Sequence, residues 1–144
     1  MKVLRSLSHY LLLTIKKGTR AVGKSKILII EDDVDMRLAL NVRLRASDYD
    51  TAFASDAVMA MSIAKKEAPD LILLDLGLPG GDGFMVLERL KIIASLACIP
   101  VIVVSARDPV GNKERALKAG AAAYFQKPVD NANLMVAIQQ ALFR

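Results

Sequence analysis

Polar residues that could do chemistry stand at the ends of apolar runs in this sequence. Glu31-Asp32-Asp33 follows one apolar run, Asp75 follows another, Ser105 ends a third and Lys127 comes just after a fourth. Carboxylates that gather without a neutralising partner repel one another and raise each other's pKa. Mg²⁺ would relieve that repulsion, because it prefers oxygen ligands and is held by a few carboxylates, a backbone carbonyl and waters.

Together these groups would support transfer of a phosphoryl group to a carboxylate. A metal held by the acids leaves positions open for the phosphoryl group, and Asp75 can then act as the nucleophile that forms an acyl phosphate. Lys127 and the metal would offset charge on the phosphoryl oxygens, and Ser105 could donate to one of them. Each residue alone has a plainer explanation as a helix cap, a turn residue or a surface lysine. The hypothesis rests on all of them reaching one edge of one predicted sheet.

The elements that would position these groups are short apolar strands alternating with helices. Strands are predicted at 27–30, 51–54, 71–74, 101–104 and 122–126. Helices are predicted from the cap Asp33 to residue 46, from Ser55 to about 67, from Phe84 to about 94, up to Gly120, and from the cap Asp130 to the end. The first helix is indicated by apolar residues at helical spacing, namely Val34, Leu38, Val42 and Ala46. This alternation predicts an α/β fold, a parallel sheet with helices on both faces and its ligand site at the carboxyl ends of the strands.

The net charge of the chain is concentrated in its first residues. The 144 residues carry 20 basic and 15 acidic side chains, a net charge of +5 that by itself suggests nucleic acid or an anionic membrane as partner. Residues 1–25 hold six basic residues and no acid, so residues 26–144 are nearly neutral. Direct nucleic-acid binding by the folded domain is therefore not expected. A single cysteine, Cys98, excludes a disulfide framework and favours a reducing cytoplasm.

The chain is thus divided into a basic N-terminal extension, residues 1–25, and one domain, residues 26–144. Leu4, Leu7, Leu11 and Ile15 recur at helical spacing in the extension, so it is either disordered or an amphipathic helix. Three interpretations stay open: a start-site extension or tail, a helix packed on this or another copy, and an anchor for a membrane surface or an acidic partner. The apolar run at 10–15 is too short to be a transmembrane segment.

Four segments resemble the receiver domains of two-component response regulators, the CheY-like family. They are ILIIEDD at 27–33, LILLDLGLPGGDG at 71–83, VIVVSA at 101–106 and AGAAAYFQKPV at 119–129, in matching order and spacing. The resemblance runs from about Lys26 to Phe143. It implies a flavodoxin-like, doubly wound five-stranded parallel sheet of strand order 2-1-3-4-5. It also implies a cytoplasmic phosphorelay signalling domain rather than a turnover enzyme.

The resemblance assigns a role to each acid at the strand ends. Asp75 corresponds to the phosphoacceptor, which takes a phosphoryl group from a phosphohistidine of a sensor histidine kinase or a histidine phosphotransfer protein. Asp32 corresponds to a direct Mg²⁺ ligand and Glu31 to an acid that acts through water. Asp75 and the backbone carbonyl of Gly77 would complete the metal site. Asp33 is instead predicted to cap the following helix.

The resemblance also implies a switch between two conformations. Lys127 and Ser105 match the lysine and the hydroxyl residue of the family, and Tyr124 matches an aromatic that turns inward when Ser105 moves toward the phosphoryl group. The change would alter a surface made by the fourth helix, fifth strand and fifth helix, where an output partner or a second copy would bind. Gly77 and Arg107 occupy positions that commonly tune loss of the phosphoryl group in this family.

The same residues disfavour two other functions, one of an enzyme and one of a binding domain. A phosphatase of the haloacid-dehalogenase type would place a second aspartate two residues after its nucleophile, where this chain has Gly77. A nucleotide-binding domain would need a G-x-G-x-x-G motif or a P-loop after its first strand, and acids stand there instead. A receiver that never accepts phosphate stays an alternative, although every expected site residue is present.

Overall fold

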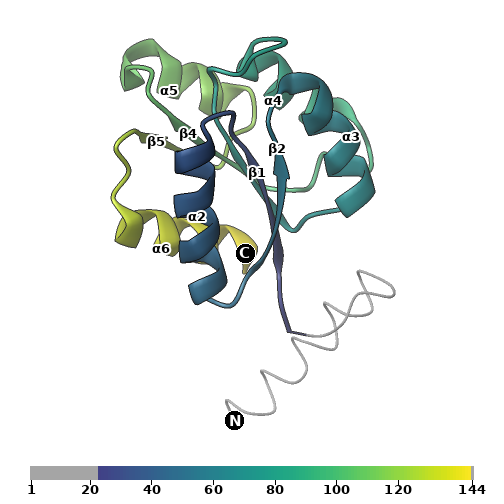
Figure 1. Ribbon diagram of the computed structural model, residues 1–144. Coiled ribbons are helices and arrows are strands. Elements are labelled where there is room, and N and C mark those ends of the chain that lie inside the picture. Colours follow the sequence, from purple (N-terminus) through teal and green to yellow (C-terminus); the bar gives the residue numbers. More distant parts are fainter. Residues whose placement is uncertain (1–22, 144) are drawn as a thin grey trace.

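The apolar runs form the strands of one sheet, and helices connect them (Figure 1). The computed structural model describes residues 23–143, so most of the predicted extension lies outside the described residues. The strands are β1 (Lys26–Ile30), β2 (Asp50–Ala54), β3 (Leu71–Leu74), β4 (Val101–Ser105) and β5 (Ala123–Gln126). The helices are α2 (Val34–Ala46), α3 (Ala57–Glu67), α4 (Gly83–Ile92), α5 (Pro109–Lys118) and α6 (Asn131–Leu142). Within the described part, none of these helices has the length and apolar content needed to cross a membrane.

The sheet has the strand order β2-β1-β3-β4-β5, and all neighbouring strands are parallel. This confirms the predicted doubly wound α/β fold and its order 2-1-3-4-5. The register brings the ends of the central strands level, because Ile30 pairs with Leu74 and Leu74 pairs with Val103. The residues that follow β1 and β3 therefore emerge side by side at the carboxyl edge of the sheet.

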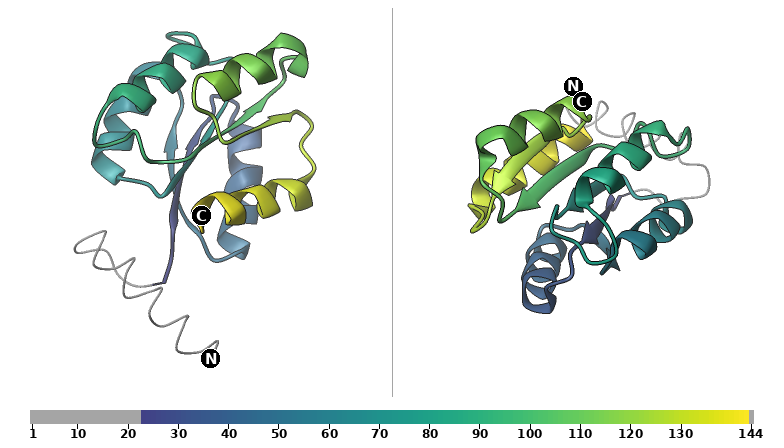
Figure 2. Two further views of the ribbon diagram at one scale, coloured as in Figure 1. Left: turned by 180° about the vertical axis from the view of Figure 1, so that it is seen from behind. Right: turned by 90° about the horizontal axis from the view of Figure 1, so that it is seen from above.

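Helices cover both faces of the sheet, as predicted (Figure 2). Successive residues of a strand point to opposite faces, so Ile27 and Ile29 pack on α2 and α6 while Leu28 and Ile30 pack toward α3 and α4. All four side chains are at most 1% exposed. Burial on both faces explains why β1 is a continuous apolar run instead of an alternating one.

The apolar stripe that indicated α2 does not pack on the sheet. Val34, Leu38 and Val42 are exposed by 54%, 53% and 68%, whereas Leu40 and Leu44 are buried. The helix carries two apolar rows, and the row with leucines at 40 and 44 is the one that packs against the sheet. Helical spacing identified the element correctly, but it did not identify its buried face.

Small differences at element ends have local causes. The helix α3 begins at Ala57 instead of Ser55, because the side chain of Asp56 caps it by accepting a hydrogen bond from the Met59 N–H. The strand β4 extends to Ser105, one residue beyond the prediction, because Ser105 pairs with Gln126 of β5. That pairing places the end of β5 beside the end of β4.

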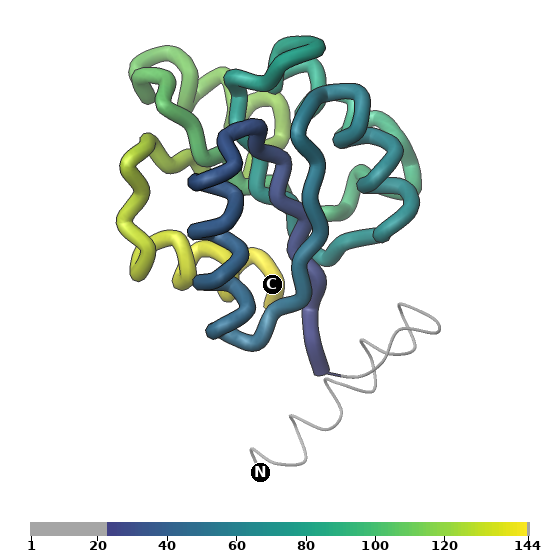
Figure 3. The backbone as a smooth tube through the Cα atoms, viewed as in Figure 1, coloured from purple at the N-terminus to yellow at the C-terminus, as the bar shows by residue number. Residues whose placement is uncertain are grey.

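The ends of the domain and the acidic residues lie at opposite edges of the sheet. The chain enters β1 and leaves α6 at the amino end of the strands, as the smooth trace in Figure 3 shows, and Ser25 and Leu142 line one depression there. The acids that follow β1 and β3 lie at the other end. The candidate site is thus remote from the point where the chain enters the domain.

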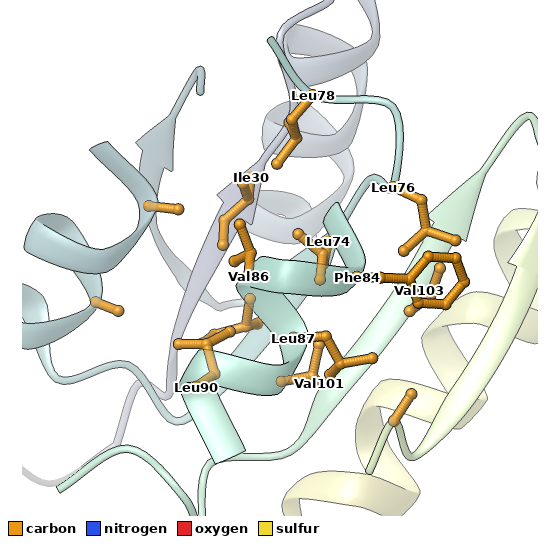
Figure 4. Close-up of a cluster of buried hydrophobic side chains, with 14 of the residues drawn as sticks. Ile30, Leu74, Leu76, Leu78, Phe84, Val86, Leu87, Leu90, Val101 and Val103 are labelled. Atoms are coloured by element: carbon orange, nitrogen blue, oxygen red, sulfur yellow. The ribbon is translucent and has the colours of Figure 1, made fainter. Parts of the chain in front are cut away.

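Gly83 lets α4 begin directly on the chain that follows Asp75. Its N–H donates to the Leu76 carbonyl at 3.0 Å, and a Cβ at this position would lie 2.4 Å from Leu76 Cα and 2.7 Å from the Asp75 carbonyl oxygen. The next residue, Phe84, is buried near Leu76 and Val103 (Figure 4). The backbone that carries Asp75 is therefore held between its own strand and the first turn of α4.

Replacing Gly83 with alanine is expected to lower the free energy of unfolding by about 3 kcal/mol, the upper end of ordinary overpacking costs. Gly77→Ala is the matched control, because its Cβ would meet nothing nearer than an Asp75 oxygen at 3.9 Å. The control should change the free energy of unfolding by less than about 1 kcal/mol. Urea unfolding followed by circular dichroism measures the free energy of unfolding of both variants. Equal losses in the two variants would contradict the close approach of Gly83 to the backbone of Asp75 and Leu76.

Candidate functional site

The ends of four strands bring the predicted polar groups together at one edge of the sheet, the upper edge in Figure 1. Glu31 and Asp75 each follow one of the paired residues Ile30 and Leu74. Lys127 follows β5, and its Nζ contacts the Glu31 carboxylate and lies 3.5 Å from Asp75 Oδ2. Residues separated by 96 and 52 positions in the chain thus form one charged cluster.

Three acids form a possible cation site. One carboxylate oxygen from each of Glu31, Asp32 and Asp75 lies within 4.8 Å of the others. Glu31 is 3% and Asp75 8% exposed, whereas Asp32 faces solvent. Three carboxylates with one open side are the donor set of a hard divalent cation such as Mg²⁺. The acids present therefore fit the predicted metal.

The two other residues predicted near the metal have defined contacts. Asp33 accepts a hydrogen bond from the Met36 N–H at 3.1 Å, so it caps α2 as predicted and stands outside the acid cluster. The Gly77 N–H donates to Asp75 Oδ1 at 3.2 Å. Gly77 therefore adjoins the cluster and holds the Asp75 carboxylate through its amide.

Burial dominates the electrostatics of Glu31. It raises the pKa of Glu31 from its usual 4.5 to about 7; the hydrogen bond from Lys127 opposes this rise and the nearby Asp75 charge adds to it. The two carboxylates raise the pKa of Lys127, although burial alone would lower it. Folded Glu31 therefore holds a proton that the unfolded chain has already lost at mildly acidic pH. The contribution of Glu31 to stability accordingly falls as pH rises from about 4.5 to about 7.

A chain of hydrogen bonds joins Ser105 to Tyr124 through the backbone of Arg107. The Arg107 N–H donates to Ser105 Oγ at 3.2 Å, and the Tyr124 hydroxyl donates to the Arg107 carbonyl at 2.8 Å. Ser105 is 1% and Tyr124 8% exposed, so the Tyr124 ring already lies inward in this structure. The predicted pair of switch residues is connected by a single intervening residue.

Two further residues at this edge make contacts that no sequence motif predicts. The Arg37 guanidinium donates to the Glu31 carbonyl at 2.9 Å, six residues away, and no motif relates these two positions. Asp82 lies 3.6 Å from a guanidinium nitrogen of Arg107 and also caps α4. Asp82 is recognisable as a helix cap from its place in the loop, but its ion pair depends on how two loops meet in space.

Comparison with known proteins gives a consistent result. Residues 27–139 match the family model described as response regulator receiver domain. The chain is 35% identical over 117 residues to sporulation initiation phosphotransferase F of Bacillus subtilis, covering 81% of this chain and 93% of that protein. It is 34% identical over 116 residues to response regulator PleD of Caulobacter vibrioides, covering 80% of this chain but 25% of that protein.

Solved protein structures have a similar fold as well. The receiver domain of a sensor histidine kinase from Pseudomonas aeruginosa, which has a magnesium ion coordinated in its active site cleft, superimposes with a TM-score of 0.77 at 26% identity. That comparison covers 85% of this chain and all of the other. The similarity in fold therefore extends over most of this chain.

Replacing Lys127 with methionine is expected to lower the free energy of unfolding by about 2 kcal/mol at about pH 8 without metal, because two buried carboxylates lose their ammonium partner. In a Glu31→Gln background the same replacement should cost less than half as much, because a single buried carboxylate then remains to be neutralised. Urea unfolding of the four proteins of this double-mutant cycle measures the coupling. Additive losses would show that Lys127 does not neutralise Glu31.

Proposed function

The chain belongs to the response regulator receiver domain family, and we propose that its Asp75 accepts a phosphoryl group from a phosphohistidine. The observation that carries this proposal is the contact of Lys127 with both Glu31 and Asp75 at the carboxyl edge of the sheet. It places an ammonium group beside the carboxylate that would react. The donor would be a histidine kinase or a histidine phosphotransfer protein, and we propose that the reaction takes place in the cytoplasm.

The proposed step is a displacement at phosphorus. An oxygen of the Asp75 carboxylate forms a bond to phosphorus while the bond from phosphorus to the imidazole nitrogen breaks. The electron pair of that bond stays on the imidazole nitrogen of the donor, whose other ring nitrogen carries a proton, so the donor leaves as a neutral histidine. The other product is an acyl phosphate on Asp75. Each receiver molecule is modified once, and it assists its own modification without turnover.

Mg²⁺ is the proposed cofactor, held by Glu31, Asp32, Asp75 and the backbone carbonyl of Gly77. The spacing of the three carboxylates supports it. When bound, the ion would offset the negative charge that the phosphoryl oxygens bring to an already acidic site. The raised pKa of Glu31 supports the same conclusion, because it indicates that Lys127 alone does not compensate the burial of these acids.

Lys127 and Ser105 are proposed to contact the phosphoryl group itself. The Lys127 ammonium lies between Glu31 and Asp75 and can exchange a carboxylate oxygen for a phosphoryl oxygen without leaving the site. The Ser105 hydroxyl accepts a hydrogen bond from the Arg107 N–H, and it can donate its own proton to a phosphoryl oxygen. Ser105 ends β4, which lies next to β3, and Lys127 follows β5, which is one strand further from β3. Their places at the ends of paired strands restrict their movement.

Tyr124 is proposed to report the state of Asp75 to the surface made by α5, β5 and α6. A displacement of Ser105 would be felt by Tyr124 through the backbone of Arg107, which hydrogen-bonds to both side chains. An output partner or a second copy of the chain would bind this surface. The chain spans about a quarter of the length of PleD.

Incubation with acetyl phosphate and Mg²⁺ is expected to add one phosphoryl group to the protein, and Asp75→Asn should abolish the addition, because an amide cannot serve as the nucleophile. Asp108→Asn is the matched control, because Asp108 is an exposed aspartate in the loop after β4 and asparagine can keep its capping bond to Val110 N–H. Intact-mass spectrometry measures the addition. An unmodified wild-type protein, or sustained hydrolysis of many phosphomonoesters, would overturn the proposal.

At about pH 8, Asp32→Asn is expected to raise the free energy of unfolding in metal-free buffer, because it removes one of three neighbouring negative charges. The same change should remove most of the stabilisation that saturating Mg²⁺ gives the wild type, on the order of 2 kcal/mol. Asp33→Asn is the control, since Asp33 caps α2 outside the cluster and should keep the Mg²⁺ effect. Thermal unfolding with and without Mg²⁺ measures both the change in stability and the stabilisation by Mg²⁺. Equal stabilisation by Mg²⁺ in the two variants would exclude Asp32 as a ligand.

A further inference from the structure

Arg107 is engaged at three points between the loop after β4 and the loop after β3. Its N–H donates to Ser105 Oγ, its carbonyl accepts from the Tyr124 hydroxyl, and its guanidinium lies 3.6 Å from an Asp82 carboxylate oxygen. Asp82 immediately precedes Gly83, whose N–H is bonded to the Leu76 carbonyl. The guanidinium is therefore held beside the segment that carries Asp75, while its own backbone holds the two proposed switch residues.

The contact of Arg107 with Asp82 is the weak one of the three. The two side chains are 39% and 46% exposed, and exposed ion pairs contribute little because water and salt screen them. A phosphoryl group carries more charge than a carboxylate and offers three acceptor oxygens, which arginine can bind in pairs. A phosphoryl group on Asp75 would thus bind the Arg107 guanidinium more strongly than the Asp82 carboxylate does.

We propose that Arg107 is a positioning residue that exchanges Asp82 for the phosphoryl group when Asp75 is modified. This inference rests on the proposed function of Asp75. In the unmodified protein the guanidinium lies beside Asp82. After modification the guanidinium moves toward the phosphoryl oxygens, and the hydrogen bonds of its backbone to Ser105 and Tyr124 keep both side chains turned toward the site.

A neighbouring arginine provides the matched control. The Arg115 guanidinium stacks on the Phe84 ring at 3.8 Å from the centroid, whereas that of Arg107 lies 5.8 Å from the same ring. Arg115 is exposed on α5, and its side chain is not bonded to Asp82, Ser105 or Tyr124. Replacing either arginine removes the same charge from the same neighbourhood, so a general electrostatic effect would act on both variants alike.

The experiment measures the affinity of the full chain for beryllofluoride in the presence of Mg²⁺, a mimic of the phosphoryl group, by titration followed in NMR spectra. Arg107→Gln is expected to weaken binding by about tenfold, because a charge-assisted contact to the phosphoryl mimic is lost. Asp82→Asn should tighten binding by about two- to fivefold, because it releases the guanidinium at the cost of one exposed ion pair. Asparagine can keep the capping bond to Phe84 N–H, so α4 should stay intact in that variant.

The opposite signs separate an exchange of partners from a merely structural contact. If the ion pair simply stabilised the loop, Arg107→Gln and Asp82→Asn would change the affinity in the same direction. Under the proposal, the double variant should bind like Arg107→Gln alone, Arg107→Lys should recover part of the affinity, and Arg115→Gln should bind like the wild type. Equal affinities for the wild type and Arg107→Gln, or equal signs for the two single variants, would overturn the inference and leave the function of Asp75 intact. A wild type that binds no beryllofluoride would overturn the proposed function, and this inference with it.

Discussion

The structure depends on the burial of two carboxylates, Glu31 and Asp75, against the single ammonium group of Lys127. Burial raises the pKa of Glu31 to about 7 even with that ammonium in contact. An arrangement of this kind costs stability, and proteins retain such costs where charge is needed for function. The remaining architecture keeps the carboxylates in place in spite of their repulsion, through the pairing of β1, β3 and β4 and the close seating of α4 on the Asp75 backbone.

The strength of that support differs around the site. On the β3 side, Gly83 is bonded to Leu76, and Phe84 is 1% exposed within the core, so Asp75 has little freedom to shift. On the β4 side, Val110 and Gly111 depart from helical backbone angles near the start of α5, and Gly111 has a φ of +78°. Local stability is lower where backbone bonds are irregular and side chains are exposed. We therefore expect a change in charge at Asp75 to be accommodated mainly in the segment between Ser105 and α5.

The sequence predicted the fold and the composition of the site for reasons that are local. Continuous apolar runs mark buried parallel strands, and parallel strands end at a common edge, so Glu31, Asp75 and Ser105 were expected to converge. The face of α2 could not be chosen in this way, because two apolar rows at helical spacing compete and tertiary packing decides between them. The contact of Arg107 with Asp82 could not be predicted from the sequence either, since it depends on the relative position of two loops.

Lys127 and Arg107 differ in a way that assigns them different tasks. Lys127 is mostly buried and already shared by two carboxylates, so a further negative charge at Asp75 can change its partner but hardly its position. Arg107 has a long, half-exposed side chain and one weak carboxylate partner, so added charge can move it. A site with Lys127 alone could stabilise a phosphoryl group without signalling its presence. Under the proposed exchange, Arg107 is connected by its backbone to Ser105 and Tyr124, and it would give the same charge a means of changing the surface of the domain.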